Sequence, residues 1–171
     1  MAALTEITFK VLPAPDESKT LIIHNQKIEA AINFLDSAIN SSNDISGATF
    51  LPLEPSVSGC VMNIEKTFKL NDLKYKGSFT AIRVEGPKNS IDQRIQNLIN
   101  ELKIMKFDIS ILQSYQSEIF WHKVKNLEFF YGSRNSLLRI VIPPSECIQL
   151  IYQFSNKFKY FLDWGGALIW M

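Results

Sequence analysis

The most distinctive local group of polar and aromatic residues is Asp163-Trp164-Gly165-Gly166, close to the end of the sequence. A carboxylate and an indole directly before two glycines can form the edge of a pocket, because glycines let a ligand or another backbone approach closely. The alternative is a bend between two strands, with Trp164 in the hydrophobic core. The residues leave both interpretations open, so we treat these four positions as a candidate pocket or interface.

Charged residues inside apolar strands are further candidates. Arg83 and Glu85 alternate with Ile82 and Val84, so both would point to one face of their strand. That face could contact a partner domain or simply face solvent. Arg139 is likewise a charged residue within an apolar stretch, and an interface is one interpretation of it.

The histidines and cysteines do not form a reactive cluster in the sequence. His24 and His122 are far apart and neither has ligand-spaced neighbours, so no catalytic or metal-binding role is predicted for either. His122 follows Trp121 on a predicted helix and is interpreted as a packing or rim residue. Cys147 lies in the first turn of a predicted helix, where the helix dipole lowers a thiol pKa. With no base near it in sequence, a small half-buried side chain is the favoured interpretation.

Several classes of function find no support in the composition. The chain has 171 residues, 46% of them hydrophobic and 20% charged, which predicts one globular domain. Its net charge of +1 gives no electrostatic reason to expect nucleic acid as a partner. We find no glycine-rich phosphate loop, no apolar run of membrane-spanning length and too few cysteines for a disulfide framework. We therefore expect a cytoplasmic protein with no transmembrane segment.

The element that organises the rest is a strand–helix–strand unit over residues 79–112. Residues 79–85 and 107–111 alternate as strands do, and Ser90 with Gln93 predicts a capping box before the intervening helix. The helix carries one apolar stripe, made of Ile91, Ile95, Leu98, Ile99, Leu102 and Met105. A helix with a single apolar stripe must cover a sheet, so the unit predicts an α+β layer.

The same strand–helix–strand pattern recurs over residues 20–53 and 137–163, and a further helix is predicted over residues 115–130. The predicted fold class is therefore α+β: a ferredoxin-like, mainly antiparallel sheet with helices packed on one face. A strand is also predicted over residues 4–12, although nothing precedes it with which it could pair. We therefore expect that the chain is part of something larger.

Five groups of residues resemble a known family, in the same order along the chain. They are residues 4–7 (LTEI) with 10–13 (KVLP) and Pro15, residues 82–86 (IRVEG), residues 120–121 (FW) with 129–130 (FF), residues 138–140 (LRI) with 142–143 (IP), and residues 163–168 (DWGGAL) with Trp170. Together they resemble the FAD-binding subunit (E subunit) of bacterial glycolate oxidase, a flavoprotein of the vanillyl-alcohol-oxidase type. Ile169 stands where that family usually has Arg.

The resemblance covers residues 1–171 as a single C-terminal cap domain, with residues 1–15 as a remnant strand that links to an FAD-binding domain. It implies that FAD is held mainly by that absent domain, so no cofactor and no metal are expected in this chain. The implied activity is that of part of an FAD-dependent 2-hydroxy-acid oxidoreductase, with no catalysis by the chain alone. The implied partners are a flavin-domain chain or other glycolate oxidase subunits, which could also hold the protein at a membrane surface.

Two other interpretations stay open. The first is a non-catalytic ferredoxin-like binding or assembly module, whose sheet edge pairs with a partner or with a second copy. The second is a decaying gene fragment that folds without a present role.

Overall fold

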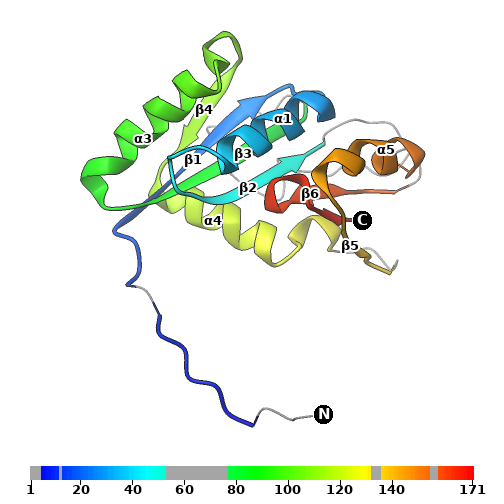
Figure 1. The fold of residues 1–171 in the computed structure, drawn as a ribbon, viewed down its shortest axis with the longest axis horizontal. Coiled ribbons are helices and arrows are strands. Elements are labelled where there is room, and N and C mark those ends of the chain that lie inside the picture. The colour runs from blue at the N-terminus through cyan, green and yellow to red at the C-terminus, as the bar shows by residue number, and fades with distance from the viewer. Residues whose placement is uncertain (1–4, 12, 53–76, 132–135, 155–157) are drawn as a thin grey trace.

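The computed structural model describes residues 5–11, 13–52, 77–131, 136–154 and 158–171 (Figure 1). These residues form one antiparallel sheet of seven strands with four α-helices, which confirms the predicted ferredoxin-like α+β class. The strands are β1 Glu17–His24, β2 Ile45–Leu51, β3 Phe79–Gly86, β4 Ile109–Leu112, β5 Arg139–Val141, β6 Phe161–Asp163 and β7 Leu168–Trp170. The helices are α1 Ile28–Ile39, α3 Lys88–Glu101, α4 Ser114–Lys125 and α5 Pro144–Phe154, with short 3-10 turns at Ile104–Lys106, Glu128–Phe130 and Trp164–Gly166.

The sheet is built from three units of the same kind. Its strand order is β4-β1-β3-β2-β6-β7-β5, so β3 lies between β1 and β2, β1 between β3 and β4, and β7 between β5 and β6. In each unit the middle strand is antiparallel to both of its neighbours, so the two flanking strands run parallel to each other. A helix connects these two flanking strands. These units are the three strand–helix–strand patterns of the sequence, which confirms the predicted recurrence.

The helices cover both faces of the sheet. The core on one side joins strand residues such as Leu21 and Ile82 to helices α1, α3 and α5. The core on the other side joins Ile22, Phe79 and Phe161 to α4, so α4 differs from the predicted packing on one face. The reason is topological, because α4 lies in the connection between β4 and β5, the two outer strands. With neighbouring strands about 4.8 Å apart, that connection has to cross about 29 Å of sheet.

Some predicted helix limits differ from those observed. Helix α3 begins at Lys88, and the Ser90 hydroxyl donates to the carbonyl of Pro87 at 3.0 Å, so Ser90 is not the predicted N-cap. Helix α4 ends at Lys125 instead of continuing to residue 130. Leu127 adopts φ +57°, and a left-handed residue cannot continue a right-handed helix.

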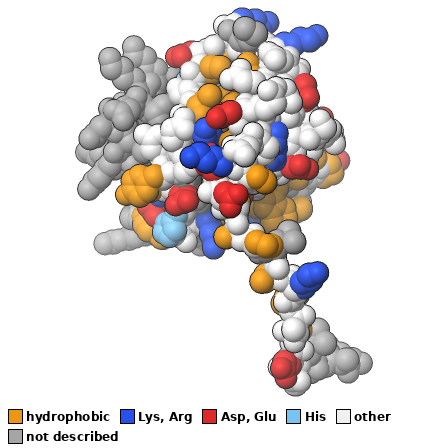
Figure 2. Space-filling model, turned by 90° about the vertical axis from the view of Figure 1, so that its left-hand side faces the viewer, with side chains coloured by type: hydrophobic (Ala, Val, Ile, Leu, Met, Phe, Trp, Pro, Cys, Tyr) orange, Lys and Arg blue, Asp and Glu red, His pale blue; other side chains and the backbone are white. Residues whose placement is uncertain are grey.

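The N-terminal segment does not form its predicted strand. Residues 5–11 carry no helix or strand and run away from the body of the molecule, and no strand of the described residues lies beside them (Figures 1 and 2). Three alternate side chains of this segment are exposed, Ile7 by 55%, Phe9 by 76% and Val11 by 81%. The sequence also predicts a short strand over residues 60–64 with a ragged continuation over 67–70, and both lie outside the described residues. Within the described part of the chain, no helix combines the length and apolar character needed to span a bilayer.

Candidate functional site

A pocket of about 690 Å³ opens between α4, the first half of β2 and the turn Trp164–Gly166. Its volume lies within the range of small-molecule sites. β2 and β6 pair at a single position, Phe50 with Leu162, and the β2 residues that line the pocket, 45–48, all precede that position. Four of the candidate residues from the sequence line this space, although they are up to 81 positions apart in the chain: Arg83, Arg139, Asp163 and Trp164.

Arg83 forms one wall of the pocket and is held by several contacts. Its Nε donates to the Ser46 hydroxyl at 3.0 Å and lies 3.3 Å from Glu85 Oε2, and its Nη2 donates to the Ser46 carbonyl at 3.1 Å. The guanidinium also lies 5.0 Å from the ring centre of Trp121. Burial lowers the pKa of Arg83, while the charges of Glu85 and Asp163 raise it. The predicted shared face of Arg83 and Glu85 therefore lies against α4.

Trp121 reaches the pocket because β2 has a glycine opposite it. A Cβ at Gly47 would lie 2.9 Å from the indole, so only glycine leaves room for the ring here. The indole Nε1 donates to the Thr20 hydroxyl of β1 at 2.8 Å, which fixes the ring orientation. Trp121 thus links α4 to the sheet and forms part of the pocket wall.

Asp163 and Trp164 form the opposite side of the pocket. Asp163 Oδ1 accepts from the backbone N–H of Trp164 at 2.9 Å and so caps the following turn. Burial raises the pKa of Asp163, while that N–H and the charge of Arg83 lower it. Trp164 adopts φ +48° and is 60% exposed, so it does not occupy the core. A non-glycine residue in the left-handed region costs about 1–2 kcal/mol, which is the kind of strain that concentrates at functional sites.

The two glycines after Trp164 do not line the pocket. A Cβ at Gly165, where φ is +66°, would lie 2.0 Å from the Ile39 Cδ1 atom of α1. Gly166 likewise has Ile32 of α1 as its nearest neighbour, at 3.6 Å from a Cβ built there. The close approach that the sequence predicted at these glycines is made by a helix, not by a ligand.

Arg139 reaches the pocket from β5, an outer strand of the sheet. Its guanidinium lies 5.2 Å from the ring centre of Trp164 and 5.9 Å from that of Trp170. The three tryptophans in the sequence, Trp121, Trp164 and Trp170, all line this one pocket.

Residue-by-residue reasoning missed Trp121, Trp170, Ser46 and Gly47 as lining residues. In the sequence, Trp121 stands out only as a neighbour of His122 on a predicted helix and as part of the family resemblance, and Trp170 only through that resemblance. The only sequence signal for them is that tryptophan is rare in this chain, since nothing local links positions 47, 121 and 170.

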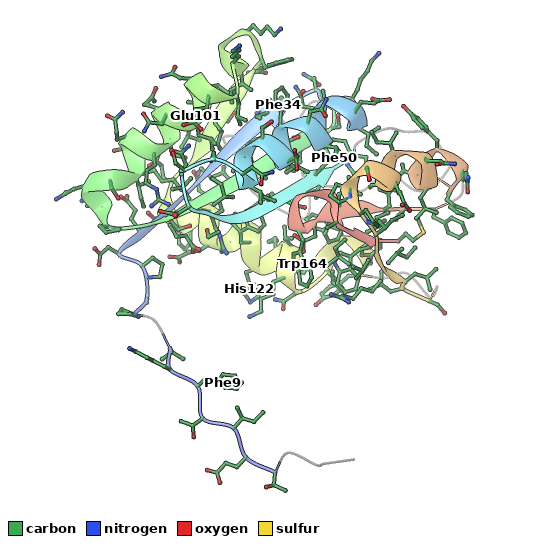
Figure 3. All side chains as sticks on the ribbon, in the orientation of Figure 1. Phe9, Phe34, Phe50, Glu101, His122 and Trp164 are labelled. Carbon is green, nitrogen blue, oxygen red and sulfur yellow. The ribbon has the colours of Figure 1, made fainter. Side chains whose placement is uncertain are left out.

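The histidines and the cysteine lie as follows. His122 belongs to α4, is exposed and lines the pocket, as a rim residue would. It lies on the same side of the molecule as Trp164 in Figure 3. His24 lies elsewhere, with its Nε2 2.8 Å from the Ser110 hydroxyl, and burial lowers its pKa. Cys147 is fully buried and burial raises its pKa to about 11, so the thiol stays protonated and unreactive. Among the described residues, no group of three acidic, His or Cys side chains could hold a metal ion.

We expect the Asp163→Asn variant to gain stability over the wild type as the pH rises. Between the ordinary Asp pKa of 3.8 and the raised native pKa, the native state binds more protons than the unfolded chain. Wild-type stability therefore falls as the pH rises through that window. The asparagine keeps the cap acceptor but has no charge to bury. Urea unfolding of both proteins from about pH 3 to 7 measures the difference, and a difference that does not change with pH would contradict it.

No family model matches the sequence, and no curated protein matches it. Among solved structures, alkyldihydroxyacetonephosphate synthase has a similar fold in two crystal forms. One comparison has a TM-score of 0.53 at 12% identity, and the other 0.54 at 11% identity. Both cover 92% of this chain but only 35% and 36% of the synthase. The likeness shows a shared fold, and this chain spans about a third of the synthase chain.

Proposed function

We propose that this chain is the cap, or substrate-side, domain of a glycolate-oxidase-like flavoprotein that acts on 2-hydroxy acids. The observation that carries the proposal is the fold shared with part of alkyldihydroxyacetonephosphate synthase, a member of the FAD-linked oxidase family. In such an enzyme the bound flavin supplies the hydride chemistry. The residues of the cap would bind the acid, orient it and exclude water from it.

The pocket does not fit the pyrophosphate of FAD. A pyrophosphate is usually held by the backbone N–H groups of a glycine-rich turn at the start of a helix. The α4 residues that line this pocket begin at Glu118, beyond the first turn of the helix, and its lining glycine, Gly47, is covered by the ring of Trp121. In the proposal, FAD is therefore held by a domain outside residues 1–171, and the chain alone has no catalytic activity.

The N-terminal segment is the proposed contact with that domain. Ile7, Phe9 and Val11 alternate with Thr8 and Lys10, and all five side chains are exposed. A segment with this alternation can add as a strand to the edge of another sheet and bury its apolar side there.

The test uses the chain alone and the chain together with a candidate flavin-domain protein, such as one encoded by a neighbouring reading frame. The purified chain mixed with FAD should show no tight stoichiometric change in flavin absorbance. Co-expressed with the flavin domain, it should elute as one yellow complex that reduces a dye when glycolate is added.

Phe9→Glu should break the complex, because it puts a charge on the buried side of the added strand. Tyr115→Glu, at a side chain that is 75% exposed on α4, is the matched control and should leave the complex intact.

Tight binding of FAD by the chain alone would overturn the proposal, and so would failure to co-elute with the flavin domain. A stable dimer of the chain alone would instead favour the assembly module. The observation that favours this second candidate is the outer strand β5, where Val141 is 61% exposed and no strand pairs with its outer side among the described residues. Dissociation of that dimer by Val141→Lys would place the interface at this edge.

A further inference from the structure

The two arginines of the pocket differ in the partners of their guanidinium groups. Arg83 is bound to Ser46 and Glu85, as described above. Arg139 is exposed and meets no carboxylate among the described residues, since its contacts are the faces of Trp164 and Trp170. Its five N–H donors lie in the plane of the guanidinium, so a ring below the plane leaves them available to an anion.

The aromatic residues give the pocket flat apolar surfaces next to that charge. Trp164 is 60% exposed, although burying an indole is strongly favourable, and it adopts a strained backbone conformation. Trp170 is half-buried beside it, and Trp121 closes the other side. A flat ring can stack on an exposed indole of this kind.

The charges around the pocket favour an anion over a cation. Three basic side chains line it, from Arg83, Lys125 and Arg139, against the two carboxylates of Glu118 and Asp163. One of those carboxylates already accepts the Trp164 backbone N–H and faces the charge of Arg83. Among the described residues neither Lys125 nor Arg139 forms an ion pair, and of these two it is Arg139 that lies on the indoles.

We propose that this pocket binds a small organic anion with a flat aromatic body, whose carboxylate pairs with Arg139 while its ring stacks on Trp164. This proposal adds a ligand class to the proposed function. It rests on that function only for the statement that the bound acid is the substrate. Binding itself requires neither the flavin nor the second domain. Among 2-hydroxy acids, the pocket should therefore bind aromatic acids more tightly than glycolate.

The test is a titration of the ¹⁵N-labelled chain, followed through the three indole N–H signals. The probes are mandelate, which has both ring and carboxylate, glycolate, which lacks the ring, and benzyl alcohol, which lacks the carboxylate. Mandelate should shift the Trp164 and Trp170 signals saturably and at least about 10-fold more tightly than either partial probe. The Trp121 signal should move least, because its N–H is already donated to Thr20.

Two substitutions test the assigned residues. Arg139→Gln should weaken mandelate binding about 10-fold or more, because it removes the charge-assisted pair. Lys88→Gln, at an exposed position on α3, lowers the net charge equally and should leave binding unchanged. Trp164→Ala should also weaken binding, with signals remote from the pocket unchanged in both pocket variants to show that the fold is intact.

Three results would overturn the proposal: no saturable shift with mandelate, equal binding of benzyl alcohol, or wild-type affinity in Arg139→Gln. These results are separable from the proposed function. If the chain binds mandelate but no flavin domain, the ligand proposal stands and the cap assignment fails. If it binds a flavin domain but no mandelate, the cap assignment stands and the ligand proposal fails.

Discussion

Replacing Phe161 with alanine should lower the free energy of unfolding by about 3–5 kcal/mol, because the change deletes a large side chain from a closed core. Phe161 is fully buried, and its ring lies 5.6 Å from that of Phe129 and 5.7 Å from that of Phe130. These contacts tie β6 to the turn Glu128–Phe130 that follows α4, and among the described residues no strand pairing joins the two. Loss of the ring should therefore remove packing contacts from the core between the sheet and α4. Equilibrium unfolding in urea measures the change.

Two companion variants make this result specific. Phe161→Leu keeps most of the apolar volume and should cost less than about 1.5 kcal/mol. Phe9→Ala removes the same ring from a side chain that is 76% exposed and should change stability by less than about 0.5 kcal/mol. Equal losses at Phe161 and Phe9 would show that β6 does not pack against the aromatic segment as described.

Replacing Thr20 with valine should cost about 1–3 kcal/mol, because it removes a buried hydroxyl shared by two partners. Thr20 Oγ1 accepts from the Trp121 indole at 2.8 Å and lies 2.7 Å from the Ser117 hydroxyl, which is in turn 2.9 Å from that of Ser18. The variant leaves the indole N–H buried without an acceptor. In a double-mutant cycle, Trp121→Phe removes that donor as well, so the double variant should be more stable than the two single losses predict, by about 1 kcal/mol.

The matched control is the same substitution at another fully buried threonine. The Thr80 hydroxyl has no hydrogen-bond partner among the described residues. Thr80→Val therefore gives up no bond and removes a buried polar group, so it should be neutral or stabilising by up to about 1 kcal/mol. A loss at Thr80 as large as that at Thr20, or strict additivity in the cycle, would contradict a stabilising role for the hydroxyl group of Thr20.

The candidate site was predictable in part. Arg83, Arg139, Asp163 and Trp164 could be chosen in advance because each breaks a local pattern: a charge within an apolar strand, or an indole before two glycines. Gly165 was chosen for the same local reason, yet its open side is filled by Ile39 of α1. A glycine pattern shows that something approaches closely, but the approaching group comes from a distant part of the chain.

The sequence by itself determined the local elements and their number of repeats. Apolar residues at every second position gave the strands, and those three or four apart gave the helices, because these are the periods at which each element presents one side to a core. The three strand–helix–strand units follow directly, and so does the α+β class. Where the prediction of an element was wrong, as in residues 5–11, the pattern was right but a pairing strand was absent from the described structure.

Only the tertiary structure decided how the units join. Side-chain alternation fixes which face of a strand is buried but not which strand lies next to it, since pairing depends on contacts between residues many positions apart. The strand order placed β4 and β5 at opposite ends of the sheet and so carried α4 across the second face. The three indoles and Arg139 meet in one pocket because distant segments pack together, not because of any pattern within one of them.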